Sequence, residues 1–296
     1  MNQPLLHRYT ILLAVCTLFL VVAGAAVTSK EAGLSVPDWP LSYGQVMPPM
    51  IGGVKFEHGH RMIATFVGML TIGLAIWLQR VDSRSWMRKL GWISLAAVIG
   101  QGILGGLTVL LLLPPGVSIA HACLAQLFFS TMLAITVFTS KRWQEGPEMV
   151  DDHGWPSLRT LAIVAPVLVL AQVALGAAFR HRVLSVMPHV IGAMVVALAL
   201  MLLGMFVLHQ FPKHRSLRSA AHTMLGVTFL QVFLGIAAYF ARLEAATKPL
   251  LMVLTTVAHV ALGALTLATT IVLSIQIRRN VRAHSAVERE HAAVTS

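Results

Sequence analysis

Eight long apolar runs limit what this chain can fold into. A helix needs about 20 apolar residues to cross a membrane, and the runs occupy residues 9–28, 58–79, 89–113, 117–140, 158–179, 185–208, 217–240 and 250–277. Of the 296 residues, 57% are hydrophobic and 11% are charged, whereas a soluble domain carries about 25% charged residues. The sequence therefore predicts an all-α integral membrane protein with eight transmembrane helices.

Basic residues are distributed unevenly between the connecting segments. The N-terminus, the 80–89, 141–159 and 213–218 loops and the C-terminal tail contain 15 of the 22 Lys and Arg residues. Cytoplasmic loops carry an excess of Lys and Arg. We therefore expect a multi-pass protein of the inner (cytoplasmic) cell membrane, with both termini in the cytoplasm. The net charge of +11 then belongs to loops beside membrane lipid and indicates no nucleic-acid partner.

A repeated pattern links pairs of these runs. In three pairs a segment with Gln and Gly (QGILGG, AQVALGA, LQVFLGI) precedes a run with a His near its start, and VVAGAAVTS before HRMIATFVG is a weaker copy. The repeat predicts two pseudo-symmetric four-helix bundles. We assign the bundles to residues 1–142, with an outer loop at 29–57, and 158–278. A cytoplasmic linker at 143–157 joins them, and a cytoplasmic tail follows at 279–296.

Four histidines stand at equivalent places in this repeat: His60, His121, His189 and His259. An ionisable side chain inside a membrane is costly and marks a functional site, although one such His alone is more often a hydrogen-bonded core residue. Two facing imidazoles in a four-helix bundle can supply both axial ligands of a haem iron. A zinc site would need three or four N, S or O ligands, and a proton relay would need interleaved Asp or Glu. The pattern favours haem iron ligation by two His in each half.

Arginines lie near the expected outer ends of these helices: Arg61, Arg180 and Arg182. Arginine pairs well with carboxylates, so these side chains could bind the propionates of a haem. They could equally be interfacial residues that extend toward the headgroups. The sequence leaves both interpretations open.

Glu57 makes the two halves unequal. It precedes His60 by three residues, a spacing that places both on one face of a helix, and the matching segment before His189 (SVMPH) has no acid. Glu57 could be a helix-start residue favoured by the helix dipole, or a group that transfers protons. The asymmetry suggests one redox cofactor in one half and one reacting ligand in the other.

The sequence resembles the haem A synthase family over nearly its whole length. The resemblance rests on VVAGAAVTSKEAGLSVPDWPLSYG, on EHGHR and on the Gln-x-x-Leu-Gly and His repeats. It implies an enzyme that converts the C8 methyl of haem O to a formyl group, with oxygen from water and haem b as the redox cofactor. It also implies haem O synthase and a terminal oxidase as partners.

The resemblance further implies roles for individual residues. His189 and His259 would bind haem b, with Arg180 and Arg182 nearby. The substrate haem O would be held by His60 and His121, with Arg61 nearby. Glu57 would assist the oxidation.

The first outer loop departs from the family pattern. Many bacterial members carry a Cys pair there, whereas this chain has Ser35, Val36 and Ser42. Two prolines, Trp39 and Tyr43 make the segment GLSVPDWPLSYG stiff and suited to the membrane interface. We expect a lid over the first haem pocket that acts by shape and not by thiol chemistry. A rigid interfacial anchor is the alternative.

Two other functions fit the same residues. A bis-His dihaem electron-transfer protein would hold two permanent haems and turn over no substrate. A haem-delivery or assembly factor for a terminal oxidase would bind haem O or haem A reversibly and change neither.

Overall fold

The protein is described from a computed structural model that covers residues 3–152 and 154–282. Within these residues, eight helices are long and apolar enough to cross a membrane, which confirms the predicted all-α membrane fold. They are α1 (Pro4–Ser29), α2 (Val54–Val81), α3 (Ser85–Leu110), α4 (Pro115–Thr139), α6 (Leu158–Arg180), α7 (Val186–Gln210), α8 (Arg215–Leu243) and α9 (Pro249–Asn280). Residue 153 of the predicted linker and residues 283–296 of the predicted tail lie outside the described residues.

Helix ends follow the positions of proline. Helices α1, α4 and α9 begin with Pro at the first helical position, where the missing N–H costs no hydrogen bond. Helix α3 ends three residues earlier than the apolar run predicts. Leu112 and Leu113 have φ of 58° and 60°, and Pro114 follows, so this backbone turns away from the helix.

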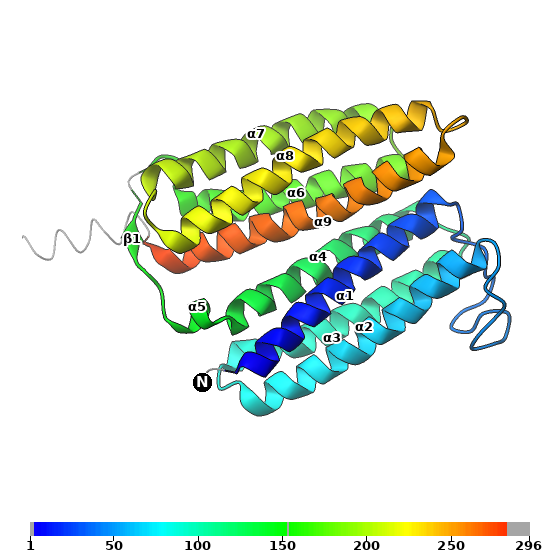
Figure 1. Ribbon diagram of the computed structural model, residues 1–296, viewed down its shortest axis with the longest axis horizontal. Helices are drawn as coiled ribbons and strands as arrows, with labels where there is room; N and C mark the ends of the chain where they lie inside the picture. Colours follow the sequence, from blue (N-terminus) through cyan, green and yellow to red (C-terminus); the bar gives the residue numbers. More distant parts are fainter. Residues whose placement is uncertain (1–2, 153, 283–296) are drawn as a thin grey trace, which may run out of the picture.

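The helices form two groups that lie side by side (Figure 1). Helices α1 to α4 pack on one another around a core that includes Leu74 and Met132, and α6 to α9 pack around one that includes Leu200 and Leu273. Helix α9 joins the groups by packing on α1 and α4. At this junction Ala264 of α9 contributes to a cluster with Phe129 of α4, since small residues let membrane helices approach closely.

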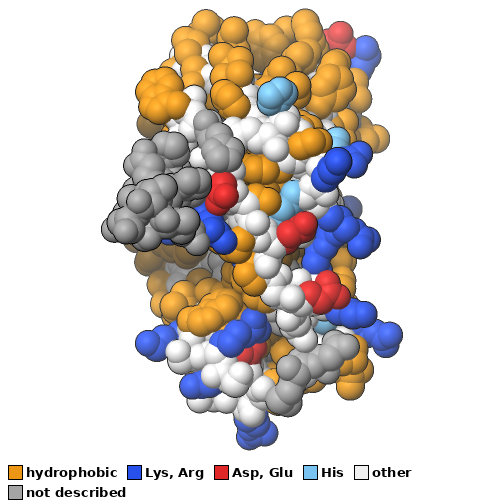
Figure 2. Space-filling model, turned by 90° about the vertical axis from the view of Figure 1, so that its left-hand side faces the viewer, with side chains coloured by type: hydrophobic (Ala, Val, Ile, Leu, Met, Phe, Trp, Pro, Cys, Tyr) orange, Lys and Arg blue, Asp and Glu red, His pale blue; other side chains and the backbone are white. Residues whose placement is uncertain are grey.

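The two ends of the helix bundle differ. We call the end that carries the 30–53 loop the loop face, and the opposite end the linker face (Figure 1). The linker includes α5 (Lys141–Gln144) and β1 (Val150–Asp151), which pairs in parallel with β2 (Val281–Arg282). Residues 279–282 of the predicted tail thus belong to the folded chain. Figure 2 looks onto the linker face, where Lys and Arg side chains surround a smaller number of acidic ones. The cytoplasmic location of this face stays a prediction.

Candidate functional site

Each of the four membrane histidines lies against a glycine of the preceding helix. The pairs are Gly24 with His60, Gly105 with His121, Gly176 with His189, and Gly235 with His259. A Cβ atom added to these glycines would lie 3.0, 3.3, 2.9 and 3.0 Å, respectively, from the imidazole Cε1. Carbon atoms in contact prefer about 3.5–4.0 Å. Only glycine therefore leaves room for the rings, and we call these four glycines the histidine seats.

The contacts between these glycines and the histidines give a physical reason for the repeated pattern. The sequence shows three of these glycines in ILGG, ALGA and FLGI. A small residue in a membrane helix by itself indicates only that a neighbouring helix can approach closely. Which side chain uses the space depends on how neighbouring helices align, and the pattern within one helix does not give that alignment.

The two rings of the second half face each other. The ring centroids of His189 and His259 are 6.2 Å apart and the ring planes are nearly perpendicular. Two metal–nitrogen bonds of about 2 Å each, together with the size of the rings, place the centres of two axial imidazoles about 6 Å apart. This separation fits a haem iron held between His189 and His259.

The first-half pair, His60 and His121, is also close enough for the two side chains to interact electrostatically. Among residues 3–152 and 154–282, no group of three or more His, Cys, Asp or Glu side chains could hold a metal ion. Two histidines in each half are the donor set that a haem iron accepts, and haem ligation by these pairs stays a prediction.

Glutamines accompany three of the four histidines. Gln101, Gln172 and Gln231 stand one helical turn before their seats, whereas Leu20 occupies that place before Gly24. The Nε2 atom of Gln172 lies 3.0 Å from Nδ1 of His189 and donates to the His189 carbonyl at 2.7 Å. Partners of this kind orient the ligands of a metal. Nδ1 of His60, His121 and His259 is buried without a hydrogen bond among the described residues, so a glutamine side-chain contact is present for His189 alone.

Glu57 and Arg61 tie the first loop to α2. Glu57 is buried, and its carboxylate accepts hydrogen bonds from Nη2 of Arg61 at 2.7 Å and from the N–H of Val36 at 2.9 Å. Nη1 of Arg61 donates to the carbonyls of Asp38 and Leu41, both at 2.8 Å. The Arg61 guanidinium is thus engaged by the protein itself, and a propionate contact from this residue stays a prediction.

A tight turn shapes the tip of this loop. Tyr43 and Gly44 have φ of 54° and 68°, and Ser42 and Gln45 pair across them through two hydrogen bonds of 3.0 Å. The N–H groups of Gly44 and Tyr43 donate to the Asp38 carboxylate at 2.8 and 2.6 Å. These bonds hold the pKa of Asp38 below its ordinary value of 3.8. These contacts organise residues 38–45, and the stiffness that the composition suggests for the whole loop stays a prediction.

The side chain of Trp39 packs the loop against α3. A Cβ atom at Gly106 of α3 would lie 2.7 Å from the Trp39 ring, so the indole rests directly on that glycine. Gly106 follows Gly105, the seat of His121. The loop therefore covers the helix turn that supports a histidine of the first half.

The other two arginines contact the first half of the chain. Nη2 of Arg180, at the end of α6, donates to the carbonyl of Ala25 at 3.0 Å and to the hydroxyl of Ser29 at 2.6 Å, both on α1. Arg182 lies 3.8 Å from Glu31, and both side chains are exposed, so this pair contributes little to stability. Their predicted propionate contacts remain predictions.

The sequence of this chain matches a known protein family. A model of the COX15-CtaA cytochrome oxidase assembly protein family matches residues 7–52 and 54–187. The chain belongs to this family.

Curated proteins named Heme A synthase are similar to this member of the COX15-CtaA family. The protein of Symbiobacterium thermophilum is 31% identical over 169 residues, which cover 55% of each chain. That of Shouchella clausii is 32% identical over 44% of each chain, and that of Shewanella oneidensis is 28% identical over 55% of this chain and 53% of its own. The chain therefore spans about half the length of the relatives it matches.

The family match covers only part of the site. It includes Glu57, His60 and His121 and ends at residue 187, before His189 and His259. The predicted haem ligation by the second pair therefore rests on the repeated seats and on the facing rings, not on the match.

Proposed function

We propose that the protein is a haem A synthase that oxidises the C8 methyl of haem O to a formyl group. The observation that supports it best is the unequal pair of two-histidine sites, of which only the first has a buried carboxylate, Glu57, and a fixed loop beside it. An enzyme that binds one haem as cofactor and another as substrate needs two sites that differ in this way.

In this proposal the second half holds haem b. His189 and His259 would be its axial ligands, and the Gly176 and Gly235 seats fix where their rings lie. Haem b, when bound, supplies one-electron redox chemistry. The protein's own contribution would be the facing pair of ligands and a half-buried cation, Arg180, near His259.

The first half would hold haem O between His60 and His121. Glu57 forms an ion pair with Arg61, so it is a carboxylate that can accept a proton from the water that supplies the oxygen. Val36 and Arg61 orient this carboxylate. Trp39 and the rest of the loop would limit access of bulk water to the reacting edge, as a lid does.

The equivalence of the four seats favours a second candidate. Four glycines that position four histidines alike would also suit a dihaem electron-transfer protein with two permanent haems. That protein would not need Glu57 for chemistry, and the ion pair with Arg61 would serve only to anchor the loop.

One experiment separates these functions. The protein is expressed with a haem O synthase in cells that lack their own haem A synthase, and the extracted haems are analysed. Haem A or its hydroxylated precursor is expected. Accumulated haem O without either product would overturn the enzyme assignment.

The Glu57→Gln variant tests the proposed chemistry. The amide oxygen can still accept the hydrogen bond from Val36, so the fold and haem content are expected to persist. Conversion is expected to fall about 100-fold or more, the usual contribution of an acid–base group. Full conversion by a haem-loaded variant would leave Glu57 as a loop anchor only.

The setting of this reaction is also a proposal. The enzyme would lie in the inner membrane with its loop face outward and would receive haem O from haem O synthase. It would supply a terminal oxidase.

A further inference from the structure

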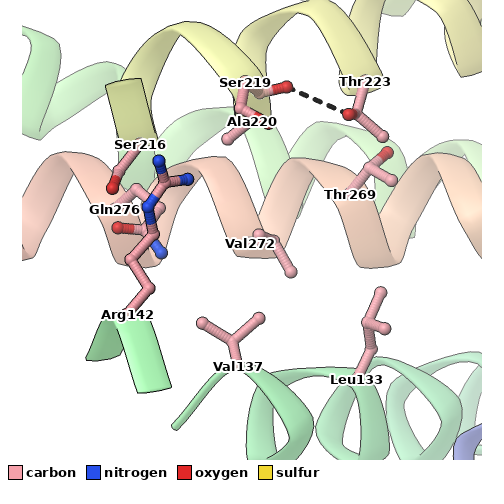
Figure 3. A pocket seen from close by; sticks show the side chains of 10 residues that line it. All are labelled: Leu133, Val137, Arg142, Ser216, Ser219, Ala220, Thr223, Thr269, Val272 and Gln276. Carbon is pink, nitrogen blue, oxygen red and sulfur yellow. Dashed lines mark hydrogen bonds between the residues drawn. The ribbon is translucent and has the colours of Figure 1, made fainter. Parts of the chain in front are cut away.

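A polar cavity lies far from the histidines, near the linker face. It has a volume of about 220 Å³ and opens between the two helix groups, with walls from α4, α5, α8 and α9. Figure 3 shows Arg142 reaching from α5 into this space, toward Ser216 on α8 and Gln276 on α9. The haem chemistry uses none of these residues.

The guanidinium of Arg142 lacks an acceptor among the described residues for one of its nitrogens. Its Nη2 atom is fully buried and has no hydrogen-bond partner within residues 3–152 and 154–282. No Asp or Glu of those residues lines the cavity. Arg142 as a whole is half-buried, but a buried donor atom without an acceptor is unfavourable, and a guanidinium suits the planar pairs of oxygens that phosphate presents.

Further donors surround the same space. Ser216 and Ser219 bring their hydroxyls to the cavity from the first two turns of α8. The start of a long helix carries a partial positive charge and free N–H groups, which favour a bound anion, and the first turn of α8 has no acidic residue.

A second, more open pocket adjoins the first at Ser219. It has a volume of about 400 Å³ and is lined by Lys213, Arg215, Arg218, Ser219 and His222. No acidic side chain of the described residues lines it either. The two pockets together form a basic region at the end of the membrane-spanning helices, where lipid headgroups lie.

The cavity is apolar on the side formed by α4. Leu133 and Val137 of α4 face Val272 of α9 across the gap between the helix groups (Figure 3). An anion at Arg142 would therefore lie beside the apolar wall that Leu133 and Val137 form, which suits an acyl chain and not a free ion.

We propose that this cavity binds the phosphate of an anionic phospholipid, with an acyl chain along the gap between α4 and α9. The lipid would neutralise Arg142 and join the two helix groups at the linker face. This site is independent of the proposed haem chemistry.

The test measures lipid binding to the purified full-length protein in a neutral detergent. Dioctanoyl phosphatidylglycerol is the probe, and dioctanoyl phosphatidylcholine and inorganic phosphate are the comparisons. Phosphatidylglycerol is expected to bind, and Arg142→Gln to weaken it about 10-fold or more, the usual effect of removing a hydrogen bond to a charged group. Arg80→Gln is the matched control, since Arg80 is exposed at the linker-face end of α2, outside both pockets.

Three results would overturn the proposal. They are unchanged phosphatidylglycerol affinity in Arg142→Gln, equal binding of the phosphatidylcholine probe, and competition by inorganic phosphate at the concentration of the lipid, which would make the ligand a free anion. If Arg142→Gln cannot be purified, the double variant Ser216→Ala and Ser219→Ala takes its place, and unchanged affinity in that variant also refutes the site.

Discussion

The histidine seats make a sharp prediction about Gly235. In Gly235→Ala the added Cβ would lie 3.0 Å from Cε1 and 3.5 Å from Nδ1 of His259. An unstrained carbon contact needs about 3.5–4.0 Å, so the imidazole must move by about 0.5 Å or more. A displacement of this size exceeds what a metal site tolerates.

The expected cost is a weaker haem site. Changes in residues that orient metal ligands lower affinity about 10- to 100-fold, which corresponds to about 1.4–2.7 kcal/mol. Haem titration followed by Soret absorption gives the affinity, and a redox titration of the bound haem reports the ligand geometry separately from folding.

Gly226→Ala is the matched control. Gly226 lies on the same helix, and a Cβ there would meet no atom within 4 Å. Alanine favours a helix over glycine by about 0.5–1 kcal/mol, so neither change should destabilise α8 itself. Wild-type haem affinity and potential in Gly235→Ala would refute the seat argument, and so would an equal loss in Gly226→Ala.

Three further predictions concern the first half. Trp39→Ala removes the indole from Gly106 and should lower haem O conversion while haem content persists; unchanged conversion would refute the lid. Because the pKa of Asp38 is lowered, its contribution to the turn is present above the ordinary value of 3.8 and is lost as the pH falls through the lowered pKa. Protection of the loop amides, as the hydrogen-exchange rate relative to that of an unstructured peptide at the same pH, should therefore be constant above pH 5 and fall only at a pH below 3.8; loss of protection above pH 5 would contradict this. Leu20→Gln places at the turn before Gly24 the residue type that contacts His189 from the equivalent turn of α6, so haem should leave the first half more slowly in a transfer assay to apomyoglobin; faster loss would contradict an orienting role for a glutamine at this place.

Much of the fold follows from hydrophobicity alone. Each predicted apolar run overlaps a helix, because crossing a membrane imposes a length and a composition that a sequence displays directly. The differences lie at the ends, where local geometry decides. Pro114 and the left-handed Leu112 and Leu113 end α3 early, and α9 begins ten residues before His259 whereas α7 begins three residues before His189, so His259 lies deeper in its helix.

The site was less predictable, because its contacts join distant segments. The spacing of Glu57 and His60 predicted a shared helix face, but the carboxylate pairs with Arg61, one residue further along. The Glu57 carboxylate also accepts a hydrogen bond from the N–H of Val36, which lies 21 residues away in the sequence. No periodic pattern encodes such a contact.

The hydrogen bonds from Arg180 to α1 join segments that are synthesised far apart in time. This arginine bonds the end of α1 from a position 155 residues later in the chain, at the residue next to Gly24, the seat of His60. The four helices of the first half are therefore synthesised before the residue that ties the end of α1 in place. A chain that stops before the end of α6 lacks this contact between the two helix groups.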